Sequence, residues 1–529
     1  MDLHSAGHSR GVAAAPHHAA AQVGRDVIAE GGNAIEAMVA MAAMIVAVYP
    51  HMTHIGGDGF WLIREPSGRV RSIEAAGFAG AGATRALYRD YETIPPRGPL
   101  AALTVPGAIG GWALAMEAAR TFGGRMPLGE LLGAAIRAAH EGYVVARSQA
   151  ALTTEKLSEL KDVPGFAATF LADGKPPEQG ATMRQAALAV TLDHLARAGL
   201  DDFYRGDVGR EIAADLERIG SPVTRHDLER YEARVRDPLS VTLRAGTLYN
   251  TRPPTQGLAS LMILALFERL GVKQAETFEH VHGAVEATKR AFRVRDTYVT
   301  DYDHLAHPPD RYLDAQFLDA EAAKIDMRRA APWPAPPEKG DTIWMGAADA
   351  KGLVVSYIQS LYWEFGSGCV LPATGVLMQN RGASFSLRPD AVNPLEPGRR
   401  PLHTLNPALA VLRDKRVIAY GTMGGDGQPQ SQAALFTRYA LFGQPLDRAI
   451  DAPRWLLGRT WASTHTNVRL ESSFDGQVIE RLMSAGHDVE VLGEAYSDTM
   501  GHAGAVVLHP DSTLEGAHDP RADGGAAGV

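Results

Sequence analysis

The chain has little cysteine and no excess of positive charge. One cysteine, Cys369, occurs in 529 residues, which excludes an intrachain disulfide framework and fits a reducing compartment. The net charge of -9 argues against a nucleic-acid-binding surface, and no cluster of lysine and arginine reverses that balance. We therefore expect no nucleic-acid partner.

Long apolar runs are also missing. The most apolar segment, residues 37–49, is too short to cross a bilayer and follows Glu36, so it predicts a buried helix and no membrane partner. Residues 1–10 contain no basic stretch followed by an apolar core, so no secretory signal is expected. With 45% hydrophobic and 21% charged residues, the sequence predicts a cytoplasmic, globular protein with a large core.

Hydrophobic periodicity predicts mainly helices before residue 342 and mainly strands after it. The expected helices span residues 19–30, 37–49, 108–121, 128–140, 183–198, 208–218, 258–270 and 280–296. Asn33 is expected to cap the helix that follows it. One early strand pair, 59–64 and 70–75, is expected around a turn. Because helices and strands are segregated along the chain, the predicted fold class is α+β.

The pair Asp341-Thr342 stands at the end of a proline-rich stretch, residues 331–340, which is the best candidate for a linker. A threonine hydroxyl is a weak nucleophile, but a threonine at the start of a chain carries a free α-amine that can take the hydroxyl proton. The following residues predict a strand, a turn at 349–352 and a returning strand, which would hold the nucleophile rigidly. The pair predicts a cleavage site; a threonine at an ordinary loop-to-strand junction is the alternative.

A glycine-rich loop spans residues 421–427. It lacks the lysine of a phosphate-binding loop and the strand–helix–strand setting of a dinucleotide site, so no nucleotide cofactor is expected. Gly424 and Gly425 suit another use, because unhindered backbone N–H groups can hold an oxyanion.

Other reactive side chains favour structural roles. His17-His18 and His51 with His54 have spacings seen in metal sites, but no cysteine or carboxylate completes a set. Capping or loop roles are favoured for them, and no metal is expected. Cys369 is predicted to be a small buried residue in a strand rather than a nucleophile.

Arg381 lies in a glycine-flanked loop after an expected strand at 375–378. An arginine in such a loop is either solvated or, because its guanidinium is planar, a clamp for a small carboxylate. The sequence of the loop does not distinguish between these two roles of Arg381.

Several motifs follow one another in the order that they have in the γ-glutamyltransferase family. They are residues 21–58, Val105-Pro106-Gly107, Phe203-Tyr204-Arg205-Gly206, Pro253-Pro254-Thr255-Gln256-Gly257, Phe365-Gly366-Ser367-Gly368, Arg400-Pro401-Leu402, Gly424-Gly425 and residues 519–524. Each motif is weak alone, but together they cover nearly the whole chain, and the sequence resembles this family. The resemblance implies an N-terminal nucleophile hydrolase with a four-layer αββα fold, in which two sheets are sandwiched between helices.

The resemblance also implies how the chain is processed. Precursors of this family cleave themselves before the threonine that matches Thr342. Cleavage would give a large subunit, 1–341, and a small subunit, 342–529, which associate in one globular core. A dimer of such heterodimers is left open.

Catalytic residues carry over from the family only where they match. Thr342 matches the nucleophile, Gly424-Gly425 the oxyanion hole, and Ser360 a hydroxyl that family members keep close to the nucleophile. The family's second threonine and the histidine after it are Ile343 and Trp344 here, so any role of that second threonine does not carry over.

The substrate pocket departs from the family pattern. In γ-glutamyl enzymes an arginine binds the α-carboxylate of the substrate and an acidic residue pairs with its α-amine, and here Ala76 and Ser384 stand at those positions. A paired serine motif has become His403-Thr404, and a cation, Arg381, appears in the loop that lost its acid. A substrate with a carboxylate and no amine needs only one opposite charge. The expected substrate-binding residues are Arg381, Tyr362, His403 and Thr404.

Within the family, the residues around Thr342, Ser360 and Arg381 are similar to members that hydrolyse oxamate to oxalate and ammonia. Arg381 would bind the carboxylate while Thr342 attacks the adjacent carbonyl, and bulky Tyr362 and Trp363 would close the cavity around a small amide. Two alternatives remain. One is a γ-glutamyl hydrolase or transferase with a rearranged pocket, and the other is an uncleaved, non-catalytic scaffold.

Overall fold

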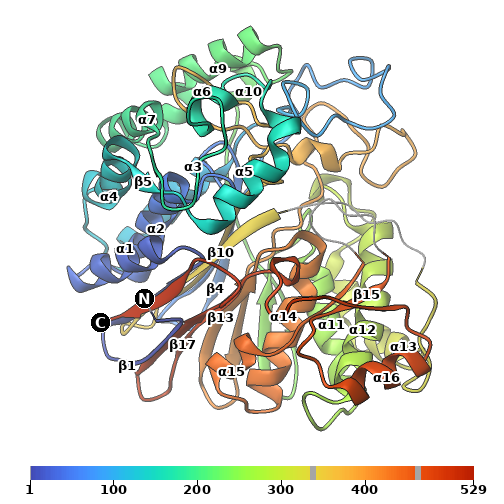
Figure 1. Cartoon of the computed structure of the whole chain (residues 1–529). Coiled ribbons are helices and arrows are strands. Elements are labelled where there is room, and N and C mark those ends of the chain that lie inside the picture. Colours follow the sequence, from blue (N-terminus) through green and yellow to red (C-terminus); the bar gives the residue numbers. More distant parts are fainter. Residues whose placement is uncertain (1, 334–340, 459–465) are drawn as a thin grey trace.

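Two seven-stranded antiparallel sheets form the centre of the molecule (Figure 1). The computed structural model describes residues 2–333, 341–458 and 466–529. In the order β19-β2-β10-β11-β3-β4-β7, the first sheet contains Gly525–Gly528, Gly11–Ala15, Asp341–Asp349, Val354–Tyr362, Asp58–Arg64, Val70–Ala75 and Arg234–Arg236. In the order β1-β18-β17-β13-β12-β9-β8, the second contains His4–His8, Leu514–His518, Ala503–Leu508, Val417–Thr422, Ala408–Leu412, Gly246–Asn250 and Leu239–Thr242. Residues on both sides of the 341–342 bond contribute strands to each sheet.

Helices cover the outer face of each sheet, which gives four layers (Figure 1). On the first sheet lie α1 His18–Ala29, α2 Ala34–Val48 and α3 Ala108–Thr121, while α4 Leu128–Glu141 packs on α2 and α7 Ala186–Ala198 packs on α4. On the second lie α11 Gly257–Arg269, α14 Gln428–Phe436 and α15 Leu446–Asp451, while α12 Phe278–Tyr298 packs on α11 and α14. The predicted α+β, four-layer αββα architecture is therefore confirmed.

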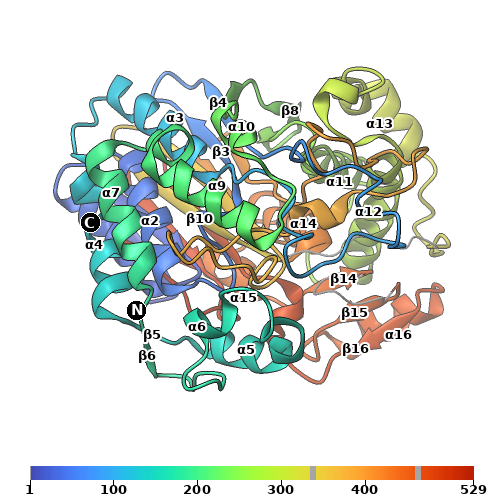
Figure 2. The ribbon, with the colours of Figure 1, turned by 90° about the horizontal axis from the view of Figure 1, so that it is seen from above.

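Smaller elements surround these layers (Figure 2). The remaining helices are α5 Arg147–Leu160, α6 Phe166–Phe170, α8 Asp202–Arg205, α9 Asp207–Ile219, α10 Arg225–Glu229, α13 Ala315–Ala322 and α16 Gly476–Ser484. The short strands β14 Trp455–Leu457, β15 Val468–Leu470 and β16 Val489–Val491 form a third sheet, and β5 Tyr143–Val144 pairs with β6 Thr182–Met183. None of the helices that the structure describes is long and apolar enough to span a bilayer.

Strand β10 shows how alternation builds the layers. Ile343, Met345 and Ala347 pack against the helices that cover the first sheet, whereas Trp344 and Ala348 point between the sheets. Such two-sided burial requires apolar side chains on both faces, which the sequence of this strand supplies.

Trp344 fills the space between the sheets because glycines face it. A Cβ atom at Gly421 would lie 2.1 Å from the indole, and one at Gly504 would lie 2.5 Å from it. The indole N–H donates to the Ser356 hydroxyl at 2.9 Å. Part of the glycine-rich loop therefore serves packing, a role that the sequence motif did not reveal.

Most of the predicted elements are confirmed, some with shifted ends. The helix at 108–121 and the strand at 70–75 have the predicted bounds, and Asn33 caps α2 through a capping box with Glu36. The helix expected from residue 183 begins at Ala186. Of the predicted linker, residues 334–340 lie outside the described residues.

Two predictions around Cys369 are wrong. Residues 375–378 form no strand, because Met378 and Leu377 make only isolated bridges, to Gly56 and Val370. Cys369 is buried as predicted but lies in a loop, where Gly366 and Gly368 take left-handed backbone angles, φ 54° and φ 78°, that end any extended run.

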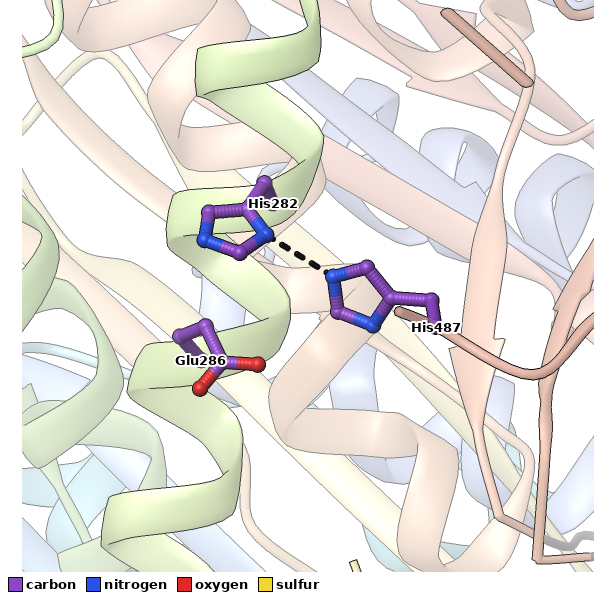
Figure 3. A group of neighbouring side chains, drawn as sticks. All are labelled: His282, Glu286 and His487. Atoms are coloured by element: carbon purple, nitrogen blue, oxygen red, sulfur yellow. Dashed lines mark hydrogen bonds between the residues drawn. The ribbon is translucent and has the colours of Figure 1, made fainter. Parts of the chain in front are cut away.

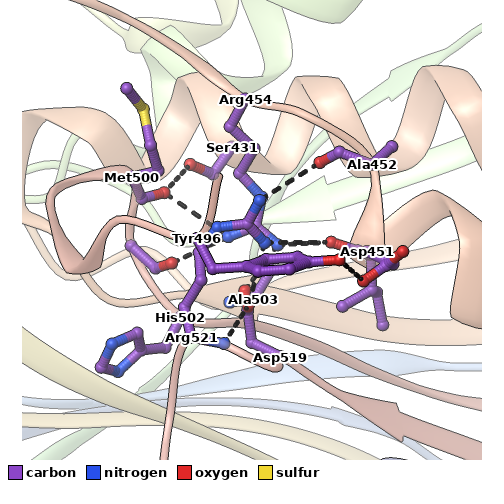
Figure 4. A network of polar contacts seen from close by, with 12 residues as sticks. Ser431, Asp451, Ala452, Arg454, Tyr496, Met500, His502, Ala503, Asp519 and Arg521 are labelled. Carbon is purple, nitrogen blue, oxygen red and sulfur yellow. Dashed lines mark hydrogen bonds and ion pairs between the residues drawn. The ribbon is translucent and has the colours of Figure 1, made fainter. Parts of the chain in front are cut away.

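A buried ion network ties the end of the chain to the second sheet (Figure 4). Asp519 lies 2.5 Å from the Arg454 guanidinium and 3.0 Å from that of Arg521, and it accepts the Ala503 N–H at 2.6 Å. Arg521 also pairs with Glu471 at 2.5 Å. Burial alone would raise the pKa of Asp519, but the two arginines outweigh burial and hold that pKa well below its usual range.

Candidate active site

Thr342 stands near the start of β10, in the middle of the first sheet. Its side chain is fully buried, and its Oγ1 donates to the Ser360 Oγ at 3.3 Å. The Ser360 hydroxyl also accepts the Tyr362 N–H at 2.7 Å. The pairing of β10 with β11 shifts by one residue between Asp341 and Ile343, a bulge that aims the threonine out of the regular ladder. The predicted nucleophile and its predicted hydroxyl neighbour are therefore in contact.

Gly424-Gly425 lies between the end of β13 and the start of α14. Both residues have left-handed backbone angles, φ 113° and φ 51°, which a residue with a side chain rarely adopts. Gly425 opens a 3-10 turn, Gly425–Gly427, that leads into the helix. The first N–H groups of such a turn have no carbonyl partner within it, so they are suited to an oxyanion.

Arg381 begins a 3-10 turn, Arg381–Ser384, and is only 1% exposed. Its guanidinium donates to the Thr404 hydroxyl at 3.2 Å and lies 3.9 Å from the centre of the Tyr362 ring. Because its side chain is buried, Arg381 is not solvated, which excludes one of the two roles that the sequence left open. Tyr362 itself has φ 86°, a strained angle for a bulky residue, of a kind that clusters at functional sites.

His403 is also fully buried, beside Asp58. Its Nε2 lies 3.1 Å from a carboxylate oxygen of Asp58, and its ring packs edge-on against Phe60. Burial, and then the Arg381 cation, lower the pKa of His403 to about 4, although Asp58 opposes the shift. The imidazole is therefore neutral at neutral pH.

Asp58 is a residue whose role the sequence did not reveal. It accepts the N–H groups of Gly77 and Gly107, both at 3.0 Å, and the side-chain amide of Gln379 at 3.1 Å. These bonds hold the β3 end, the loop after β4 and the turn before α3 in place around His403. The only signal in the sequence was its position inside a family motif.

Gln256 was missed as well, although it belongs to the Pro253–Gly257 motif. Its amide N–H groups donate to the main-chain oxygens of Thr404, at 2.7 Å, and Gly425, at 2.8 Å. One side chain therefore joins the loop that carries Thr404 to the loop that carries the glycine pair.

The structure thus links the predicted site residues through contacts. Thr342 contacts Ser360, Ser360 contacts the Tyr362 backbone, and the Tyr362 ring covers Arg381, which donates to Thr404. The Ser384 hydroxyl donates to the Leu402 carbonyl at 3.1 Å. The backbone of Asp341 pairs with Tyr362 across the sheet.

Three side chains elsewhere come close enough together to hold a metal ion: His282 and Glu286 on α12, and His487 after α16 (Figure 3). Their ligand atoms lie within 4.8 Å of one another. The two imidazoles, however, hydrogen-bond each other at 2.8 Å, and Glu286 is paired with the Lys289 ammonium at 2.7 Å. A neighbouring cation disfavours a second one, so the group is best explained as a polar cluster.

The earlier histidine pairs and the cysteine have structural surroundings. The His17 side chain caps α1 by accepting the Ala19 N–H, as the sequence predicted, and His54 accepts the Leu377 N–H at 3.1 Å. Burial raises the pKa of the Cys369 thiol to about 12, so it is not a thiolate at neutral pH.

Comparison with known proteins agrees with this fold. The gamma-glutamyltranspeptidase family model matches residues 20–529, and the chain belongs to this family of N-terminal nucleophile hydrolases. It is an amidohydrolase. It is 51% identical to the oxamate amidohydrolase proenzyme of Klebsiella pneumoniae, over 99% of this chain and 100% of that one.

Two further relatives show the range of the family. A glutathione hydrolase-like proenzyme of Bacillus subtilis is 38% identical, with 97% of each chain covered. The crystal structure of a cephalosporin acylase from Bacillus halodurans superposes with a TM-score of 0.91 at 31% identity, covering 100% of this chain and 97% of that one.

Proposed function

We propose that the chain is a self-processing amidohydrolase that cleaves oxamate to oxalate and ammonia. The observation that carries the proposal is the buried Arg381, held between Thr404 and the Tyr362 ring in the loop where γ-glutamyl enzymes have an acid. A buried guanidinium suits a substrate that carries a carboxylate next to its amide. The 51% identity to an oxamate amidohydrolase proenzyme supports the same substrate.

Processing comes first in this proposal. The Thr342 hydroxyl attacks the carbonyl carbon of Asp341, the peptide nitrogen leaves as the new α-amine, and water then hydrolyses the ester. The chain is thereby divided into subunits 1–341 and 342–529, which stay associated because both contribute strands to each sheet. Relatives named as proenzymes support such a step.

Turnover uses the same threonine. Its free α-amine takes the hydroxyl proton, and Oγ1 attacks the amide carbonyl of oxamate. The oxygen of the tetrahedral intermediate is held by the N–H groups of Gly424-Gly425. Collapse of the intermediate returns the proton to the departing nitrogen, so ammonia leaves and an oxalyl ester remains on Thr342. Water attacks this ester, and oxalate leaves.

The neighbours of the threonine have supporting roles. Ser360 orients the nucleophile, since its hydroxyl accepts from Thr342 at 3.3 Å. Arg381 and Thr404 bind the substrate carboxylate, Tyr362 limits the size of the acyl group, and the neutral His403 shapes the wall beside them. Because the carboxylate and the attacked carbonyl of oxamate are adjacent, binding at Arg381 also orients the carbonyl.

A γ-glutamyl hydrolase or transferase is the second candidate, favoured by the 38% identity to a glutathione hydrolase-like proenzyme. The substitutions Ala76 and Ser384 argue against it, because neither side chain can pair with the charges of a glutamyl group. The second candidate therefore requires new partners for both charges.

One assay separates the two candidates. Purified, cleaved protein is incubated with oxamate, glutathione or glutamine, and released ammonia and glutamate are measured. Ammonia from oxamate with no glutamate from glutathione is the expected result. Glutamate release without any turnover of oxamate would reject the oxamate assignment.

A further inference from the structure

Gln256 lies just before α11, 0% exposed, and reaches both sides of the candidate site. Its backbone N–H donates to the His403 carbonyl at 2.9 Å, and its side-chain amide donates to the carbonyls of Thr404 and Gly425. Both amide hydrogens are thereby used, each on a different loop. The side chain thus spans the gap between the residue that contacts Arg381 and the glycine pair.

The other end of the same side chain is held by a charge pair. The Gln256 amide oxygen accepts from the Arg295 guanidinium at 2.9 Å, and the same nitrogen of Arg295 lies 2.9 Å from the Asp426 carboxylate. Arg295 and Asp426 are 4% and 3% exposed. Buried charged hydrogen bonds are among the stronger ones, so the amide of Gln256 is fixed in one orientation, with both N–H groups toward the loops.

We propose that Gln256 is the positioning residue that sets the spacing between the oxyanion glycines and the carboxylate-binding side of the site. The inference rests on the proposed function, because it needs Gly424-Gly425 and Arg381 to act on one substrate. A small substrate is held at both ends by groups from two loops, and a shift of about 1 Å between such groups can cost on the order of a hundredfold in rate. The Gln256 side chain fixes the distance between the two loops.

The substitution Gln256→Glu keeps the size of the side chain and its bond to Arg295 but replaces the NH2 group, which supplies both donors, by one acceptor oxygen. That carboxylate oxygen then faces the carbonyls of Thr404 and Gly425, repels both and pushes the loops apart. We expect kcat with oxamate, per cleaved molecule, to fall by about one to two orders of magnitude. Gln256→Met, which removes the hydrogen bonds without adding charge, should give a smaller loss in kcat.

Gln185 offers a matched control. It is 4% exposed, and its amide also donates to two main-chain carbonyls, of Val46 and Ala47 at 3.2 and 2.9 Å, in the helical layer over the first sheet. Gln185→Glu should lower the melting temperature at least as much as Gln256→Glu and leave kcat per cleaved molecule within about twofold.

A second measurement separates positioning from general stability. If Gln256 acts by placing the glycines relative to Arg381, its effect on kcat/KM should shrink in an Arg381→Ala background, because the carboxylate is then no longer held at one end. If Gln256→Glu folds but cuts itself slowly, its rate of self-cleavage is compared with that of Gln185→Glu. Slower self-cleavage in Gln256→Glu alone also supports the positioning role of Gln256.

Wild-type kcat in Gln256→Glu, or equal losses in Gln256→Glu and Gln185→Glu, would overturn the inference. Its failure is distinct from failure of the proposed function, because the latter shows in the wild-type protein as absence of oxamate turnover. If wild type hydrolyses another amide instead, the same variants are measured with that amide, and an unchanged kcat again overturns the role of Gln256.

Discussion

The ion network at the second sheet and the candidate active site both contain buried arginines, and these arginines have different neighbours. Arg454 and Arg521 pair with the carboxylate of Asp519 in the network at the second sheet (Figure 4). Arg521 also pairs with the carboxylate of Glu471. Arg381 donates to the Thr404 hydroxyl and lies against the Tyr362 ring. The arginines of the network pair with carboxylates of the chain itself and so act on its stability, whereas Arg381 lies in the candidate site and is proposed to bind the carboxylate of a substrate.

The largest effect is expected for the nucleophile, Thr342, and it should be confined to the candidate active site. Thr342→Ala should abolish both self-cleavage and amide hydrolysis, because the nucleophile of each is the same hydroxyl, and it should leave the ion network intact. Intact mass and ammonia release test the first part, and the urea midpoint of the uncut chain tests the second. An active Ala variant would remove Thr342 from the mechanism.

Arg521→Ala should act on stability. Removing one partner of a buried network leaves Asp519 and Glu471 with unbalanced charge, which costs about 3–5 kcal/mol in the free energy of unfolding. The shift of the urea midpoint, measured in the Thr342→Ala background so that one chain unfolds, gives this cost. The cleaved Arg521→Ala protein that does fold should retain its kcat with oxamate, and a loss of kcat without loss of stability would contradict the division.

Arg381→Ala should act on the reaction. We expect kcat/KM for oxamate to fall roughly thirtyfold, because a buried charge partner of the substrate is lost. This loss corresponds to about 2 kcal/mol of transition-state stabilisation. An amide without a carboxylate, such as acetamide, is the control substrate and should lose much less. Unchanged turnover of oxamate would exclude Arg381 from substrate binding.

The smallest expected effect is a change in how the free energy of unfolding depends on pH. The folded-state pKa of His403, about 4, lies below its ordinary value of 6.5, so the unfolded chain binds this proton first as the solution is acidified. The stability that neutral His403 contributes is present above pH 6.5 and is lost as pH falls through 4. Asp519, whose pKa is also depressed, from 3.8, contributes stability that is lost only at lower pH.

Unfolding midpoints from pH 7 to 4 test this difference. His403→Asn should reduce the fall in stability between pH 7 and about pH 5.5 by about 1 kcal/mol. Asp519→Asn should lower stability across the range without removing that slope. Equal slopes in wild type and His403→Asn would contradict the assignment of a neutral buried imidazole.

The sequence predicted features that depend on nearby residues. Strong periodicity and flanking glycines located the helix at 108–121, and the apolar strand after Thr342 located the hairpin β10–β11. Family motifs added the contact between Thr342 and Ser360, which lie on paired strands. In contrast, the expected strand at 375–378 has an apolar pattern but no continuous partner, and a pattern alone does not reveal whether a neighbouring strand exists.

Contacts between distant segments were not predictable. The amide of Gln256 reaches Gly425, which is 169 residues away, and Asp58 receives the amide of Gln379, which is 321 residues away. No local signal distinguishes these polar residues from surface ones. Trp344 posed the same problem, since the glycines that make room for it lie on β13 and β17.

The position of β10 between β2 and β11 has a consequence for the life of the protein. If the 341–342 bond is cut, segments from the two products alternate, meeting at two strand junctions in one sheet and three in the other. Neither product can dissociate from the other without breaking strand pairing in both sheets and exposing their inner faces to water. Such a cut would therefore be a maturation step after which the two products stay paired through the shared sheets.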